Sequence, residues 1–121
     1  MLRPANRMRR SSDFASVVRS GARARRGTVV VHQLAGAAPA AVPIVGLVVG
    51  RGVGNSVTRH QVSRRLRAQL AARIEALPPA SGTVVRALPT AAQATSAQLG
   101  IDLDAALRRL TPVTSRPVDN R

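Results

Sequence analysis

Apolar residues near the start of the chain are spaced as in a helix. Phe14, Val17 and Val18 stand at i, i+3 and i+4 and predict a short helix with one inward face. The Ser11–Ser12 pair can cap its start, and Gly21 is a stop signal at its end.

The spacing then changes to that of strands. Residues 22–27, ARARRG, form either a connector or a short edge strand, and residues 28–34, TVVVHQL, are rich in β-branched side chains and predict a strand. Small residues and prolines at 35–43 predict a loop. The continuous apolar run at 44–50, IVGLVVG, is typical of a central strand.

Helical spacing returns from residue 55 to residue 77, where a Pro-Pro pair ends it. Residues 83–88, TVVRAL, predict a third strand. A last helix is expected at 95–110, because Thr95 and Gln98 have the spacing of a capping box. It carries a stripe of leucines, Leu99, Leu103, Leu107 and Leu110.

This order, α-β-β-α-β-α, predicts a small α/β (α+β) two-layer sandwich with a single sheet. A chain of 121 residues suits one domain. We assign that domain to residues 11–111, preceded by a flexible basic arm at 1–10 and followed by a frayed tail at 112–121.

Charge narrows the class of partner. The net charge is +14, from 19 basic residues, all arginine, against 5 acidic ones. Such an excess is typical of proteins that bind nucleic acid or an anionic membrane surface, and arginine forks suit phosphate. A membrane fits less well, because the chain has one aromatic residue and no long apolar run. The absence of cysteine excludes disulfides and thiolate chemistry.

The predicted helix at 55–77 places its charge on one side. Val62, Leu66, Leu70, Ile74 and Leu77 share one sector of about 120°, which we expect to pack on the sheet. His60, Arg64 and Arg67 form an outward row, Arg65 flanks the apolar sector, and Arg59 lies in the first turn. An ordinary solvated face would mix acids with bases, yet Glu75 is the one acid in this segment. The row therefore favours a phosphate-bearing partner.

The basic arm, with Arg7, Arg9 and Arg10, could alone be read as a mitochondrial presequence. We favour an arm, because the excess of arginine continues through residues 19–26 and 51–67.

The acids do not indicate catalysis. Asp13, Glu75, Asp102, Asp104 and Asp119 make no convergent cluster for a two-metal nuclease, and Asp102 and Asp104 are expected at the surface of the last helix. The segment GRGVGN at 50–55 has neither the lysine nor the register of a nucleotide-binding loop.

The segment VGLVVGRGVGNSVTRHQVSRRLR at 45–67, together with DFASVVRSG at 13–21, resembles the bacterial ribonuclease P protein component. The resemblance extends from about residue 7 to residue 110. It implies a left-handed crossover between two parallel strands, where the general rule predicts a right-handed one.

The resemblance also implies a function: the RNA-binding protein subunit of ribonuclease P, which removes the 5′ leader from precursor tRNA. The catalytic RNA would carry the chemistry with Mg²⁺, and the protein would bind that RNA and the leader. We accordingly expect a bacterial cytoplasmic protein, one copy per catalytic RNA, with no membrane and no nucleotide cofactor.

Site residues carry over by position. The family's Arg-Asn-Arg motif falls on Arg59, His60 and Gln61, so its first arginine alone is kept. The implied RNA-binding residues are Arg51, Asn55, Arg59, His60, Arg64, Arg65 and Arg67. The implied leader-binding cleft holds Phe14, Val18 and His32, where Phe14 is equally well a core residue and His32 a possible second platform.

Two rival functions share this charge and size. A ribosomal or other structural RNA-binding protein would not change precursor-tRNA cleavage. A nucleoid or DNA-binding protein would show a helix-turn-helix or dimer pattern, which we do not find.

Overall fold

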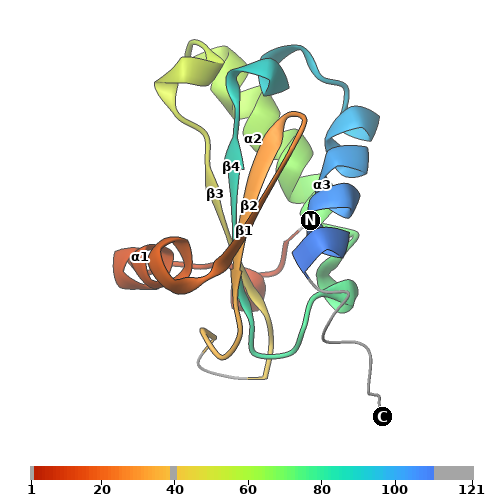
Figure 1. Ribbon diagram of the computed structural model, residues 1–121. Coiled ribbons are helices and arrows are strands. Elements are labelled where there is room, and N and C mark those ends of the chain that lie inside the picture. Colours follow the sequence, from red (N-terminus) through yellow and green to blue (C-terminus); the bar gives the residue numbers. More distant parts are fainter. Residues whose placement is uncertain (1, 39–40, 111–121) are drawn as a thin grey trace.

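The computed structural model describes residues 2–38 and 41–110, which fold around one four-stranded sheet (Figure 1). The helices are α1 (Ser11–Ser20), α2 (Ser56–Ala71) and α3 (Ser96–Leu110). The strands are β1 (Ala22–Arg26), β2 (Val29–Leu34), β3 (Ile44–Val48) and β4 (Gly82–Ala87). The predicted α+β class with one sheet is confirmed, and residues 22–26 are an edge strand rather than a connector.

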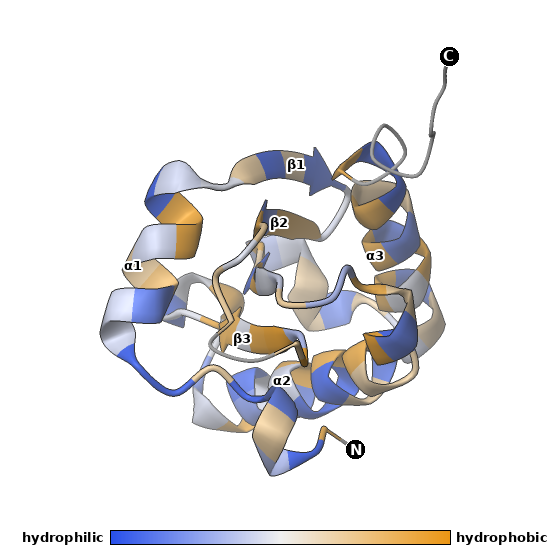
Figure 2. Cartoon of the chain, turned by 90° about the horizontal axis from the view of Figure 1, so that it is seen from below, coloured by the Kyte–Doolittle hydropathy of each residue, from blue (hydrophilic) through white to orange (hydrophobic). Residues whose placement is uncertain are grey.

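The sheet is mixed and its order is β1-β2-β4-β3. β2 pairs antiparallel with both β1 and β4, whereas β3 and β4 are parallel. The connection from β3 through α2 to β4 is left-handed, as the resemblance implies, which Figures 1 and 2 let the reader trace from two directions.

The two faces of the sheet are covered unequally. α2 and α3 lie against one face, and α1 crosses part of the other (Figure 2). The larger core lies under α2 and α3, where Val31 and Val85 of the sheet join Leu66 and Leu103. A smaller cluster around Val17 and Val84 seats α1. Within residues 2–38 and 41–110, no other helix covers the α1 side of the sheet (Figure 2).

Residues 2–10 do not form the expected free arm. Leu2, Asn6 and Met8 are buried, and a short 3₁₀ turn spans Pro4–Asn6. Arg7 forms a parallel bridge with Val45, whose carbonyl accepts a 2.8 Å hydrogen bond from the Met8 amide. Pairing with the outer edge of β3 thus fixes this segment. The tail predicted at 112–121 lies outside the described residues.

α2 ends at Ala71, six residues before the expected end. Arg73 has φ −113° and ψ 3°, which leaves the helix, and a 3₁₀ turn at Ile74–Ala76 follows. This turn brings Leu77 into the core. The second predicted strand is also shorter, because a 3₁₀ turn at Arg51–Val53 follows β3. The expectation that it is a central strand is wrong, since β3 lies at one edge of the sheet. No helix in the described part of the chain is both long and apolar enough to cross a membrane.

Candidate nucleic-acid interface

The outer face of α2 presents the predicted basic row. Asn55 caps the helix, since its Oδ1 accepts a 2.9 Å hydrogen bond from the Thr58 amide. Val62, Leu66 and Leu70 are buried against the sheet, as predicted. His60, Arg64 and Arg67 are therefore turned outward, and all three are exposed. This row offers two guanidinium groups and an imidazole to a partner.

Two other arginines of α2 are less available. Arg65 is half-buried and donates a 3.0 Å hydrogen bond to the carbonyl of Ala94, so part of its fork holds the segment before α3. Arg59 is also half-buried, and its buried Nε has no hydrogen-bond partner. Arg51, on the turn after β3, is exposed.

Phe14 and Val18 of the predicted cleft are half-buried in the small cluster under α1. The ring of Phe14 lies directly on β3 at Gly46. A Cβ at that glycine would stand 2.5 Å from the ring carbons Cε1 and Cζ. Phe14 is therefore a packing residue that seats α1, with part of its ring at the edge of the uncovered sheet face.

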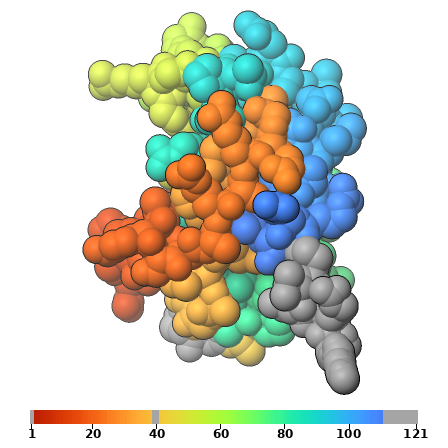
Figure 3. Space-filling view, in the orientation of Figure 1, coloured from red at the N-terminus to blue at the C-terminus, as the bar shows by residue number. Residues whose placement is uncertain are grey.

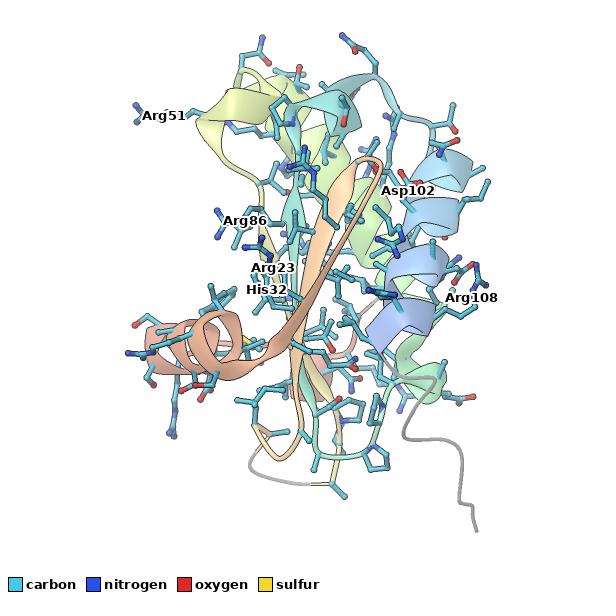
Figure 4. The ribbon with its side chains drawn as sticks, viewed as in Figure 1. Arg23, His32, Arg51, Arg86, Asp102 and Arg108 are labelled. Carbon is cyan, nitrogen blue, oxygen red and sulfur yellow. The ribbon has the colours of Figure 1, made fainter. Side chains whose placement is uncertain are left out.

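His32 lies on this same side of the sheet, next to two arginines that sequence reasoning missed. Its partners across the strands are Arg23 on β1 and Val84 on β4, and Arg86 is the next residue on that side of β4. Figure 4 shows Arg23, His32 and Arg86 together on the side of the sheet from which α1 projects. Alternation in the ARARR segment was the available signal for Arg23, because it places every second side chain on one face.

His32 is 4% exposed, and its Nδ1 has no hydrogen-bond partner. Burial lowers the pKa of His32 below its usual 6.5, and the charges of Arg86 and Arg23 lower it further. The imidazole is therefore neutral at pH 7.

The uncovered face forms a recess. In Figure 3 the outline is notched between α1 and the turn at Arg51–Val53. A hollow of about 100 Å³ lies there, between Gly50, Gly52 and Arg86. Apart from residues 49–51 themselves, no described atom lies within 4 Å of where a Cβ of Gly50 would stand, so the backbone is open to a ligand.

The arginines of the N-terminal segment line a separate hollow. Arg7, Arg9 and Arg10 are exposed and surround a space of about 490 Å³ together with Asp13 and the loop at 36–38. Arg9 also donates a 3.3 Å hydrogen bond to the carbonyl of Pro4.

One expectation for the acids is wrong. Asp102 is buried, because its Oδ2 accepts hydrogen bonds from the amide (2.9 Å) and hydroxyl (2.6 Å) of Thr28, at the turn between β1 and β2. Gln98 donates to its other oxygen at 3.1 Å. Asp104 is exposed, as predicted, and pairs with Arg73 at 2.6 Å, which lowers the pKa of Asp104. Both carboxylates therefore serve the packing of α3.

Among residues 2–38 and 41–110, no group of three or more His, Cys, Asp or Glu side chains is placed to hold a metal ion.

Comparison with known proteins identifies the family. The family model "Ribonuclease P" matches residues 2–111. A "Ribonuclease P protein component" from Streptomyces bikiniensis is 50% identical over 117 residues, covering 91% of this chain and 95% of that protein. One from Salinispora tropica is 46% identical over 124 residues, covering 88% of this chain and 91% of that protein.

Solved structures agree on the fold. The RNase P protein of Staphylococcus aureus superposes with a TM-score of 0.77 at 21% identity, covering 88% of this chain and 95% of that one. That of Thermotoga maritima gives 0.71 at 19% identity, covering 88% and 96%. The chain therefore belongs to the family of bacterial ribonuclease P protein components, the RNA-binding subunits of the endoribonuclease that matures the 5′ ends of tRNA.

Proposed function

We propose that this chain binds two RNA segments on two sides of its sheet. The row of His60, Arg64 and Arg67 on α2 contacts the catalytic RNA. The uncovered sheet face beside α1 receives the 5′ leader of precursor tRNA. One observation carries this proposal: on two surfaces that the sheet separates lie basic side chains that make no ion pair with any of the described residues.

In this proposal the catalytic RNA, and not the protein, carries out the cleavage of precursor tRNA. The carboxylate of Asp102 accepts hydrogen bonds from Thr28 and Gln98, and that of Asp104 pairs with Arg73. Both acids therefore have structural partners. Mg²⁺ belongs to the holoenzyme and is held mainly by RNA phosphates. We further propose one copy of the protein per catalytic RNA and a cytoplasmic location, where precursor tRNA is made in bacteria.

A reconstitution experiment tests the proposal. Purified protein is added to its catalytic RNA at low Mg²⁺, and removal of the leader is measured against RNA alone. We expect the protein to restore cleavage and to favour precursor over mature tRNA in binding. No effect on cleavage, with binding to ribosomal RNA instead, would favour a structural RNA-binding protein.

Substitutions on α2 test the assignment of its surface. Replacing Arg64 and Arg67 with Ala should weaken binding to the catalytic RNA and reduce the log–log salt slope by about 0.7–0.9 for each lost phosphate contact. Arg108→Ala, at an exposed position of α3, is the control for general loss of charge. Equal effects of the two changes would mean that the α2 row acts as diffuse charge.

A further inference from the structure

Three arginines share the uncovered face of the sheet. In the strand register Arg25 faces Val30, and Val30 faces Arg86, so these three side chains stand on one side. Arg23, opposite His32, stands on the same side one pair further along. We call Arg23, Arg25 and Arg86 the sheet-face arginines. Arg25 and Arg86 are two strands apart, or about 10 Å at ~4.8 Å per strand.

No acid neutralises these charges within the described residues. There the single ion pair joins Arg73 to Asp104 on the opposite side of the molecule, and none of the described acids lies on a strand. Like charges on one face repel each other, and an anionic ligand relieves that repulsion. An anion that spans several strands would therefore relieve the repulsion among the sheet-face arginines.

His32 lies among the sheet-face arginines without adding to their charge. It is buried between Arg23 and Arg86 and neutral at pH 7. The positive potential of the face therefore comes from guanidinium groups, which bind phosphate oxygens in a bidentate manner.

This face of the sheet offers almost no aromatic side chain on which a base could stack. Phe14 is the one aromatic residue of the whole chain, and its ring is packed against Gly46. Single-stranded RNA is commonly held by a basic groove together with aromatic rings on which successive bases stack. Here the basic surface is present, but the sequence lacks the several aromatic residues on which successive bases could stack.

We propose that the sheet face holds the leader through its phosphates, by the sheet-face arginines, and not through its bases. This inference rests on the proposed function, in which the leader occupies this face. It assigns Arg23, Arg25 and Arg86 as leader-binding residues. It also makes recognition of the leader insensitive to base identity.

Chemically altered leaders test the inference with the unaltered protein. The holoenzyme is given precursor tRNA with a natural leader, with a leader of abasic nucleotides, and with a leader of uncharged methylphosphonate linkages. We expect the abasic leader to keep the preference for precursor over mature tRNA within about threefold, and the methylphosphonate leader to lose it. A loss of about fivefold or more per abasic position, the effect of removing a stacked base, would overturn the inference.

Variants then locate the contacts. Arg23→Gln and Arg86→Gln should each reduce the salt slope of leader binding by about 0.7, the value for one contact to a single strand. Arg108→Gln is the matched control on α3. Equal slopes in all three variants would overturn the assignment of these arginines.

The two proposals fail in different ways. If the natural leader itself gives no preference over mature tRNA, the proposed function fails, and this inference fails with it. If the natural leader gives the preference and the methylphosphonate leader keeps it, only this inference is overturned.

Discussion

His32 shows how one buried side chain ties the stability of the fold to pH. Its pKa is below 6.5 in the folded protein because of burial and of Arg86 and Arg23, whereas the unfolded chain keeps the usual value. Between these two pKa values the unfolded state binds more protons. The contribution of His32 to stability is therefore complete above pH 6.5 and declines as the pH falls toward the lowered pKa.

We accordingly predict that the melting temperature drops between pH 7.5 and pH 5.5, and that His32→Gln removes part of this drop. Thermal unfolding of the free protein at both pH values measures it. His60→Gln, at an exposed position on α2, should keep the wild-type drop. A His32→Gln variant with the full wild-type drop would contradict the prediction.

Asp102 is the other residue whose environment decides its role. Its carboxylate satisfies the amide and hydroxyl of Thr28, which are 74 residues away in sequence. Asp102→Ala should lower the free energy of unfolding by about 2–4 kcal/mol, because it leaves both buried donors unpaired. Urea denaturation measures this loss. Asp104→Ala removes a half-exposed ion pair and should cost about 0.2–1 kcal/mol, so equal losses would refute the role of Asp102.

At the scale of elements, the fit of α1 on the sheet depends on glycines in the strands. A Cβ at Gly46 would meet the Phe14 ring at 2.5 Å, and one at Gly82 would meet Val17 Cγ2 and Ala37 Cβ at 2.8 Å. These two positions let α1 approach β3 and β4 closely. The helix consequently forms one wall of the recess in which the leader is proposed to lie.

Gly46→Ala should therefore push the Phe14 ring away and lower the free energy of unfolding by about 1–3 kcal/mol, the usual cost of overpacking. The cost should be smaller in a Phe14→Leu background, where the ring is gone. Urea denaturation of the double-mutant cycle tests this. Gly50→Ala, which meets open space, is the control and should be nearly neutral.

Sequence-based prediction succeeds for elements whose hydrophobic pattern is local. It fails for residues whose burial or orientation is set by contacts with segments distant in the sequence. The apolar stripe of α2 correctly indicates that Val62, Leu66 and Leu70 are buried. Asp102 was expected at the surface, because nothing in its own helix shows that the turn at Thr28 would cover it. The sequence does not identify Arg86 for a similar reason: within TVVRAL, only the pairing with β2 reveals which face of the sheet its side chain joins.

The site follows the same division. The exposed row on α2 could be derived from helical periodicity alone. The sheet face could not, since it combines side chains from β1, β2 and β4 through a register that no single segment contains. The left-handedness of the crossover from β3 to β4 is implied by the family resemblance alone, because the general rule for such connections predicts a right-handed one.

At the scale of the whole molecule, the N-terminal segment belongs to the folded domain. Leu2 is 5% exposed within the larger core, and Asn6 Nδ2 donates a 2.9 Å hydrogen bond to the carbonyl of Pro43. These contacts tie Leu2 to the larger core and Asn6 to the start of β3.

An N-terminal truncation that begins at Arg7 should therefore lower the free energy of unfolding by about 2–4 kcal/mol, from the lost burial of Leu2 and the lost hydrogen bond. Urea denaturation at fixed ionic strength measures it. Arg3→Gln in the full chain, which removes one of the deleted charges at an exposed position, should be nearly neutral. A truncated protein as stable as the full chain would restore the picture of a free arm.

The two outer edges of the sheet differ in how they are kept from pairing with other molecules. Residues 7 and 8 cover β3, whereas β1 is the opposite edge strand and carries Arg23, Arg25 and Arg26. An unpaired strand edge is a template for aggregation, and charged side chains on the edge strand are one of the means by which proteins prevent it. RNA that neutralises those arginines without covering the strand removes that protection. Free protein mixed with a substoichiometric amount of RNA is thus expected to precipitate, and the precipitate is expected to dissolve again once RNA is in excess.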